Sequence, residues 1–386
     1  WDFIDEEISS LKNKINSEIK TATPFPILSL IDLPDMQKKN AENYVKNEYS
    51  LSNNLEPIIK KPPNKKIRIG YYSADFNNHP TSFLMIQLLE LHDRHNFEIY
   101  CFSLANRKDD EMRTRVLNEC DKFLDVSLKS DEEIAKISRD LNIDIACDVM
   151  GFTKGNKFQI FAEKCAPIQV SYLAFPGTTG ANFIDYVIAD KIVISQELKK
   201  HYSEKIIFLP DTYQVNDSLK KISDKVFTRE EMGLPKDSFV FCCFNKNYKI
   251  LPRVFDIWMN LLKKVKGSVL WLLVENLKAQ ENLKKEATKR NIDKNRIIFA
   301  KIVPLGDHLA RHRCADLFVD TFPYTAHTTC SDALWAGLPV VTRIGNSFAS
   351  RVSASLLNAI DLPELITHSE EEFENLALDF ANDKNK

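Results

Sequence analysis

Several motifs that identify common nucleotide or metal enzymes are missing from this chain. Glycine is scarce, with 10 residues among 386, and no G-x-G-x-x-G follows an apolar segment, which argues against a dinucleotide-dependent dehydrogenase. No D-x-D occurs, which argues against transferases that hold Mg²⁺ or Mn²⁺ on paired aspartates, because hard cations need such oxygen ligands. H-E-x-x-H is absent too. In GFTKGNK (151–157) the glycines are four apart and no Ser or Thr follows the last lysine, so it is not a Walker-type phosphate loop.

The chain also lacks long apolar runs, an excess of charge of one sign and C-x-x-C motifs. No stretch approaches the roughly 18 apolar residues of a membrane span. The 52 basic and 54 acidic residues give a net charge of -2, so we expect neither nucleic acid nor membrane as a partner. The eight cysteines form no C-x-x-C pair, and no charged-then-apolar leader follows Trp1. These features predict buried, reduced thiols and a cytoplasmic location.

What the chain does contain is an alternation of short apolar strands and amphipathic helices. It begins at IRIGYYS (67–73), continues to DYVIAD (185–190), and restarts at FVFCCFN (239–245). This pattern predicts parallel sheets covered on both faces by helices. The polar, turn-rich stretch 209–236 reads as a connector, so the fold class is α/β with two sheets.

We therefore predict three parts. Residues 1–62 form a helical lead-in in which PFPILSLIDLPD interrupts the helices as an extended or turn segment, and KKPPNKK (60–66) marks its end. Residues 63–215 form a first Rossmann-like lobe, and residues 216–386 form a second one that binds a nucleotide. Ligands of such folds bind at the carboxyl ends of the strands.

The strongest local candidate for a site is FPYTAHTTCSDALWAGLPVVT (322–342). A strand ends, a turn carries His327, Thr328 and Thr329, and a helix begins. Hydroxyl side chains at a helix start are good caps, and the same geometry presents unbonded amide groups to an anion. Capping alone would also explain these residue types.

Four further segments carry polar side chains where a strand ends or on one helix face. Each also has an ordinary structural explanation, such as a tight turn or an exposed helix face. Lys246 and Lys249 follow FVFCCF, where a lysine can meet a phosphate as a point charge. His79 lies in a polar turn after the first strand and can act as a base near neutral pH. FPGTTGA (175–181) allows close backbone approach to a ligand, and His308 and Arg311 share one helix face.

Taken in order, these segments resemble a known family. ADFNNHPTSFLM, APIQVSYLAFPGTTGANFIDYVIAD, FNKNYKI, TFPYTAHTTCSDALWAGLPVVTRIG and SFASRVSASLL resemble the catalytic region of protein O-linked N-acetylglucosamine transferases and their bacterial relatives. The resemblance runs from about Ile67 to the end of the chain. It implies a two-lobed GT-B fold, a UDP-GlcNAc donor, Ser or Thr acceptors in proteins, inversion at the anomeric carbon, and neither metal nor cofactor. Tetratricopeptide repeats usually precede this region, and none is visible here.

The resemblance also implies roles for individual residues. Lys249 matches the lysine on the donor diphosphate, and His79 matches a histidine proposed as the base. The remaining positions match donor contacts: His308 and Arg311 at the uracil, His327, Thr328 and Thr329 around the diphosphate, Asp332 at the ribose, and Pro176, Gly177 and Thr178 near the sugar. We also expect Lys246, which follows the same strand as Lys249, among the donor-binding residues.

Some positions depart from the family pattern. Phe152 stands where many bacterial relatives have a histidine, and Ala174 replaces the usual glycine before the aromatic residue of the sugar loop. Lys246 stands where the animal enzymes have glutamine, and Leu305 replaces a donor-site lysine. These differences bear on sugar identity and rate more than on fold.

Other functions stay open at this point. A Spindly-type protein O-fucosyltransferase would use GDP-fucose, although His327 and the SDALWAGLP helix favour the UDP-sugar branch. An asparagine-glucosylating relative fits Asp332 poorly, and no motif matches a UDP-GlcNAc epimerase. A non-catalytic nucleotide-binding scaffold would be favoured by loss of Lys249 or of the His-Thr-Thr turn, and both are present.

Overall fold

The structure is a computed structural model that describes residues 1–18, 22–49, 55–58 and 64–383. The chain folds into two compact units. We call Ile4–Leu219 the N-terminal lobe, and Lys220–Lys386 together with Trp1–Phe3 the C-terminal lobe. The division falls inside the stretch 209–236 that the sequence indicates as a connector. The expected boundary at 62 lies outside the described residues.

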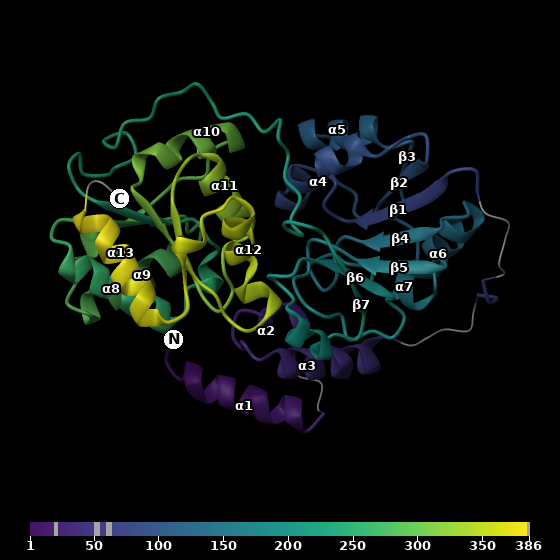
Figure 1. Cartoon of the computed structure of the whole chain (residues 1–386), viewed down its shortest axis with the longest axis horizontal. Coiled ribbons are helices and arrows are strands. Elements are labelled where there is room, and N and C mark those ends of the chain that lie inside the picture. Colours follow the sequence, from purple (N-terminus) through teal and green to yellow (C-terminus); the bar gives the residue numbers. More distant parts are fainter. Residues whose placement is uncertain (19–21, 50–54, 59–63, 384–386) are drawn as a thin grey trace. The chain divides into compact units, whose positions relative to one another are not determined.

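The described part of the N-terminal lobe contains a seven-stranded parallel sheet in the order β3-β2-β1-β4-β5-β6-β7 (Figure 1). Its central strands are short and apolar. In β1 and β2 the residues toward the carboxyl end are buried, whereas those at the amino end are exposed or partly exposed. A sheet of this kind needs helices on its faces, as the alternating sequence predicts. The strands are β1 (Ile67–Ser73), β2 (Phe97–Ser103), β3 (Lys122–Asp125), β4 (Ile145–Asp148), β5 (Ile168–Ser171), β6 (Tyr186–Ala189) and β7 (Lys205–Phe208).

Helices between these strands begin at recognisable caps. Asp110 accepts a hydrogen bond from the Arg113 amide, and Ser130 forms a capping box with Glu133. The helices of this lobe are α1 (Ile4–Asn16), α2 (Pro24–Ile27), α3 (Pro34–Glu48), α4 (Pro80–Leu91), α5 (Glu111–Glu119), α6 (Asp131–Asp140), α7 (Gln159–Ala162) and the 3₁₀ helix η1 (Gln196–His201).

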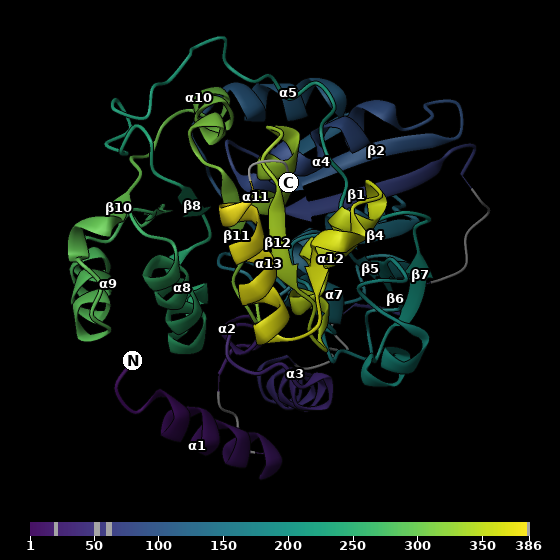
Figure 2. The same cartoon turned by 60° about the vertical axis from the view of Figure 1, so that its left-hand side comes forward.

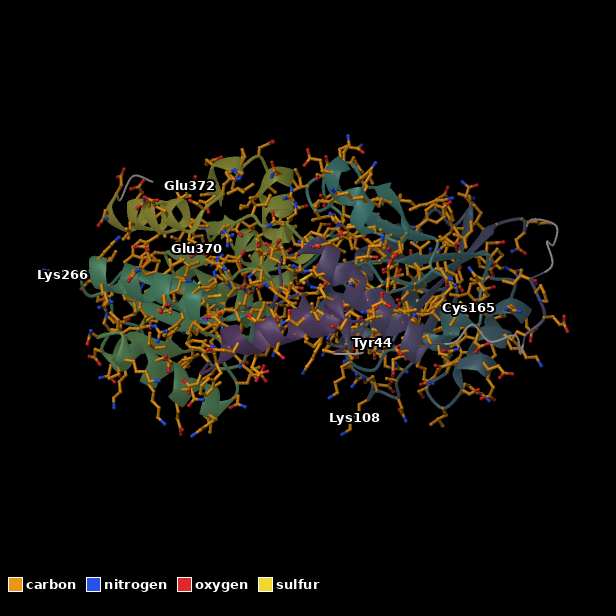
Figure 3. The ribbon with its side chains drawn as sticks, turned by 90° about the horizontal axis from the view of Figure 1, so that it is seen from below. Tyr44, Lys108, Cys165, Lys266, Glu370 and Glu372 are labelled. Atoms are coloured by element: carbon orange, nitrogen blue, oxygen red, sulfur yellow. The ribbon has the colours of Figure 1, made fainter. Side chains whose placement is uncertain are left out.

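The lead-in packs on the first sheet through aromatic side chains. Tyr44 on α3, labelled in Figure 3, lies 5.5 Å from the ring of Phe152, which in turn lies 5.1 Å from Phe175. A Cβ on Gly180 would come within 2.5 Å of the Glu42 amide nitrogen, so only glycine lets α3 approach this closely. Phe152, which departs from the family pattern, is therefore a core residue that holds α3.

One local expectation about the lead-in is wrong at Pro24–Ile27, whereas residues 28–33 form a turn and a non-helical stretch as expected. The segment PFPILSLIDLPD was expected to be extended or turn-like, but Pro24–Ile27 form one helical turn. Pro24 occupies the first turn of this helix, where its missing amide hydrogen has no intrahelical acceptor in any case. Proline thus starts a helix here, where we expected it to interrupt one.

The described part of the C-terminal lobe contains a six-stranded parallel sheet in the order β10-β9-β8-β11-β12-β13. Helix α13 packs across β11 and β12, as Figure 2 shows. The strands are β8 (Val240–Cys243), β9 (Val269–Leu272), β10 (Ile297–Phe299), β11 (Leu317–Val319), β12 (Val340–Arg343) and β13 (Ile366–Thr367). The α-helices are α8 (Pro252–Lys264), α9 (Leu277–Lys289), α10 (Leu305–Arg311), α11 (Thr328–Trp335), α12 (Val352–Ala359) and α13 (Glu370–Asn382). The 3₁₀ turns are η2 (Asn247–Lys249), η3 (Lys294–Arg296), η4 (His312–Cys314), η5 (Phe348–Ser350) and η6 (Pro363–Leu365).

Each sheet has a point at which the direction of strand addition reverses. In the N-terminal lobe this point lies between β1 and β4, and in the C-terminal lobe it lies between β8 and β11. Loops leaving two such strands diverge to opposite sides, which opens a crevice at their carboxyl ends. The segments after β8 and β11 are those that carry Lys249 and His327.

No helix in the described ranges is both long enough and apolar enough to cross a membrane.

Candidate active site

Lys249 ends the 3₁₀ turn η2 that follows β8, and its side chain is buried. Its Nζ donates a hydrogen bond of 2.8 Å to the Thr325 carbonyl and lies 3.8 Å from the centroid of the Tyr324 ring. Burial lowers the pKa of Lys249 to about 8, while the carboxylate of Asp320 opposes this shift. The carbonyl takes one of the three donors that an ammonium group has. The site thus holds a cation beside the turn from β11 to α11.

This turn presents the start of α11 next to Lys249. His327 precedes α11, and Thr328 and Thr329 form its first turn. The Thr329 hydroxyl donates to the Asn245 side-chain oxygen, which ties the helix start to the end of β8. Amide groups in a first helical turn have no intrahelical acceptor and carry the positive end of the helix dipole. A diphosphate is the kind of ligand that such a helix start and a buried lysine bind.

His327 is half-buried and packs against the same aromatic ring as Lys249. Its ring lies 4.7 Å from that of Tyr324, and its Nε2 is 3.2 Å from the Ala349 carbonyl. Burial and then the charge of Lys249 hold the pKa of His327 well below 6.5. The imidazole is therefore neutral, and a bond to the Ala349 carbonyl requires the proton on Nε2.

His308 and Arg311 on α10 form a pair in which the arginine orients the histidine. Arg311 is 1% exposed, and its Nη2 and Nε lie 2.7 and 3.1 Å from His308 Nδ1. A guanidinium only donates, so Nδ1 is an acceptor and Nε2 carries the proton. Burial, with His312 and Arg311, lowers the pKa of His308 to about 2. Arg311 also donates to the Lys301 carbonyl, so its direct contact with a base stays a prediction.

Asp332, on α11, is buried and paired with Lys220. The Lys220 Nζ lies 2.8 Å from Asp332 Oδ1, and the Trp335 indole donates to the Lys220 carbonyl at 3.1 Å. Burial raises the pKa of Asp332, and Lys220 opposes this shift. The ion pair holds the Asp332 carboxylate in one orientation on α11, the helix whose first turn contains Thr328 and Thr329.

Lys246 lies in a different environment from Lys249, although the two share a turn. Its side chain is exposed and pairs with the Glu275 carboxylate. The Lys249 amide donates to the Lys246 carbonyl at 3.0 Å, so the backbone joins the two residues. The structure therefore brings Lys249 and the His-Thr-Thr turn together and leaves the Lys246 ammonium on the surface.

In the N-terminal lobe, His79 lies after β1 and directly before α4. Its Nδ1 is 3.3 Å from the Thr81 amide nitrogen and 3.5 Å from Asp75 Oδ2. These two contacts need opposite protonation of Nδ1, so they exclude each other. When Nδ1 carries the proton and donates it to Asp75, Nε2 is free of a proton and can accept one. When Nδ1 accepts from the Thr81 amide, the proton of the neutral ring is on Nε2, which then cannot act as a base. Burial raises the pKa of Asp75, opposed by His79 and Arg107.

The loop that contains Pro176, Gly177 and Thr178 is held by one buried carboxylate. Glu204 accepts hydrogen bonds from the Thr178 hydroxyl at 2.7 Å and from the Thr179 amide at 2.6 Å. Pro176, Gly177 and Thr178 are themselves buried, and the side of Gly177 that would carry a Cβ faces Phe175 and Leu28. A loop fixed in this way can present its backbone to a sugar without reorganising.

No group of three or more His, Cys, Asp or Glu side chains among the described residues is arranged to hold a metal ion. All eight cysteines are present as thiols, and all but Cys120 are buried.

Comparison with known proteins identifies the family. Residues 43–226 and 220–386 match the model of glycosyl transferase family 41. The chain belongs to this family. A relative from Arabidopsis thaliana, named "Probable UDP-N-acetylglucosamine--peptide N-acetylglucosaminyltransferase SEC", is 40% identical over 86% of this chain and 34% of the relative. A second from the same plant, with the same enzyme name followed by SPINDLY, is 28% identical over 84% of this chain and 36% of the relative.

A solved structure of a family member agrees in fold. A mutant of the Thermobaculum terrenum O-GlcNAc transferase superposes with a TM-score of 0.83 at 25% identity, covering 99% of this chain and 74% of that one. The two parallel-sheet lobes and the helical lead-in are therefore the GT-B fold that the sequence resemblance predicts. The chain spans about a third of the length of the curated family 41 relatives named above.

The structure of this family 41 chain also adds site residues that the sequence patterns did not indicate. Asp75 lies beside His79, Glu204 fixes the loop at 176–178, Lys220 pairs with Asp332, and Asp320 accepts from the amide of Ala326 in the turn before His327. Asp75 and Asp320 both follow the end of an apolar strand, and this position in the sequence could have indicated them as site residues. Glu204 and Lys220 lie in polar stretches without a pattern, so only their tertiary contacts reveal them.

Proposed function

We propose that this chain is the catalytic region of an inverting glycosyltransferase that moves N-acetylglucosamine from UDP-N-acetylglucosamine to Ser or Thr hydroxyls of proteins. The observation that carries the proposal is the buried Lys249, held against the turn that opens α11 at the point where β8 and β11 diverge. The family 41 relative with 40% identity is named for the same donor and for peptide acceptors.

The proposed reaction places negative charge where this site has positive groups. The acceptor oxygen forms a bond to the anomeric carbon from the face opposite the diphosphate, and the bond from that carbon to the diphosphate oxygen breaks. The electron pair leaves on UDP, where Lys249 and the amide groups of Thr328 and Thr329 would stabilise it. Such preorganised stabilisation is often the largest catalytic effect.

The acceptor hydroxyl must also lose its proton. His79 would accept it on Nε2 in the arrangement in which Nδ1 shares its proton with Asp75. Pro176, Gly177 and Thr178 would contact the sugar through the backbone of a loop that Glu204 holds. His308 would stack on the uracil with Arg311 behind it, and Asp332 would bind the ribose hydroxyls.

The proposal includes the absence of a metal ion or cofactor, because Lys249 and a helix start would neutralise the diphosphate. It also includes a cytoplasmic location, which the reduced state of eight thiols supports. The partners are then the UDP-sugar and protein acceptors, without nucleic acid or membrane.

Calorimetric titration with UDP, GDP and UDP-N-acetylglucosamine tests the proposal directly. Binding of UDP with much weaker binding of GDP is the expected result. Preference for GDP would point to the fucosyltransferase alternative. Binding of UDP without hydrolysis or transfer of the sugar would leave only a nucleotide-binding scaffold and would overturn the enzymatic proposal.

A further inference from the structure

Asp320 lies directly after β11 and is fully buried, yet neither the family resemblance nor the proposed reaction uses it. Its carboxyl group is surrounded by five donors from four segments of the C-terminal lobe. Oδ1 accepts from Asn245 Nδ2 at 3.1 Å and from the Thr321 and Ala326 amides at 2.7 Å each. Oδ2 accepts from the Thr342 hydroxyl at 2.7 Å and the Ser353 hydroxyl at 2.6 Å.

Three of these donors cannot act as acceptors, and this bears on the charge of Asp320. Backbone and side-chain amide N–H groups only donate, so Oδ1 carries no proton. The hydroxyl groups at Oδ2 can turn either way, and Ser353 Oγ is also 2.7 Å from the Ala326 carbonyl. Burial raises the pKa of Asp320, whereas its hydrogen bonds favour the ionised form. An ionised carboxylate here needs a nearby cation.

Among the described residues, Lys249 is a cation that this carboxylate acts on. Its Nζ bonds the Thr325 carbonyl, and the amides of Thr321 and Ala326 on either side of that carbonyl bond Asp320. One carboxylate therefore fixes the turn that Lys249 contacts and also attracts the ammonium electrostatically. The turn and the lysine are the two parts of the proposed diphosphate site.

We propose that Asp320 is a positioning residue of the diphosphate site: its ionised carboxylate keeps Lys249 an ammonium ion and holds the Thr321–Ala326 turn in the shape that receives the donor. This inference rests on the proposed function. It assigns the residue that maintains the positive charge of the site, whereas the proposed reaction only uses that charge.

Other groups also face this pair. Cys243 on β8 acts on Lys249, and Lys249 acts on His327 before α11. The Tyr324 ring lies beside Lys249, and the Tyr248 ring lies 6.4 Å from that of Tyr324. On the side of α11, burial raises the pKa of the Cys330 thiol, and the carboxylates of Asp320 and Asp332 raise it further. His327 is neutral and burial raises the pKa of Cys243, Cys330 and Tyr248, so Lys249 is the group that titrates near pH 8.

The experiment measures UDP affinity from pH 7 to 10 by calorimetry in the unmodified chain, Asp320→Asn and Thr325→Val. Phosphate ionisation is nearly complete above pH 7. The uracil ring loses its N3 proton only at the upper end of this range and does so in all three titrations, so a shift of the midpoint between variants reports the protein. We expect affinity in the unmodified chain to fall as pH rises through about 8, the pKa of Lys249. In Asp320→Asn this fall should begin about one pH unit lower, because the attractive charge is gone.

Thr325→Val is the matched control. It removes the hydroxyl that donates to the Ala349 carbonyl at 2.9 Å and loosens the same turn, but it retains the Asp320 charge. Its affinity should drop at every pH while the midpoint stays in place. If Asp320→Asn behaves like Thr325→Val, Asp320 acts only through structure, as a protonated acid would, and the inference is wrong.

A second measurement does not require the Asp320 variant to fold. Competitive acetylation of the unmodified chain with acetic anhydride, followed by mass spectrometry, gives the midpoint at which Lys249 loses its proton. A midpoint of about 8 or higher supports the inference, and a lower one overturns it. Failure of UDP to bind the unmodified chain would instead overturn the proposed function, so the two failures are distinguishable.

Discussion

Lys220 and Asp332 form an ion pair with 2.8 Å between Nζ and Oδ1, and the two side chains are only 3% and 7% exposed. Lys220 opens the C-terminal lobe and Asp332 lies on α11, so the pair fixes the segment that enters the lobe to the helix of the candidate site. The Trp335 indole, one helical turn after Asp332, bonds the Lys220 carbonyl and reinforces the attachment.

Breaking this pair should destabilise the C-terminal lobe strongly. Lys220→Met leaves Asp332 buried without its partner, which we expect to lower the free energy of unfolding by about 3 kcal/mol. Denaturant unfolding measures this, with Lys221→Met as the control at the exposed neighbouring lysine. The double variant Lys220→Met/Asp332→Asn should regain stability but not UDP affinity. Full recovery of UDP affinity would contradict a ribose-binding role for Asp332.

Removing the charge of Lys249 should abolish transfer without unfolding the chain. Lys249→Met keeps most of the buried stem and loses the ammonium, and we expect turnover to fall by at least about a hundredfold. Lys246→Met is the matched control, since Lys246 lies in the same turn but is exposed and paired with Glu275. Sugar-transfer assays and thermal unfolding decide the outcome. Comparable activity in the two variants would remove Lys249 from the mechanism.

The buried histidines predict how stability depends on pH. Burial lowers the pKa of His312 to about 4, below the value of about 6.5 expected in the unfolded chain. The unfolded state then binds the extra proton first, so stability is present above pH 6.5 and is lost as pH falls toward 4, by about 1.4 kcal/mol per pH unit. His312→Asn should flatten this slope in denaturant unfolding, while exposed His368→Asn should not. Equal slopes in all three chains would refute the assignment.

Chelation tests the proposed independence from metal. We expect UDP binding and sugar transfer to persist in excess EDTA, because the proposed positive groups are Lys249 and the amides of α11. The comparison is turnover before and after chelation, and again after Mn²⁺ is restored. Loss of activity that Mn²⁺ reverses would show that a divalent ion takes part.

Local patterns in the sequence predicted the elements of both sheets well where strands were apolar and flanked by helices. The segment 67–73 is β1 residue for residue, and 185–190 is β6 with one additional residue at each end. Strands β3, β7 and β13 were not predicted, because they are only two to four residues long and β3 and β7 have exposed positions. Short edge strands are defined by their pairing partner more than by their own residues.

The sequence by itself determined the fold class, the family resemblance and the set of polar residues that follow the strands. It determined them because strand and helix periodicity and the order of motifs are local properties of the chain. Only the tertiary structure decided which of these residues meet. Lys249 and Lys246 are three positions apart, yet one is buried against Thr325 and the other is paired with Glu275. The carboxylates that hold the site, Asp320 and Glu204, act through hydrogen bonds between segments far apart in the chain, and such contacts leave no periodic signal in the sequence.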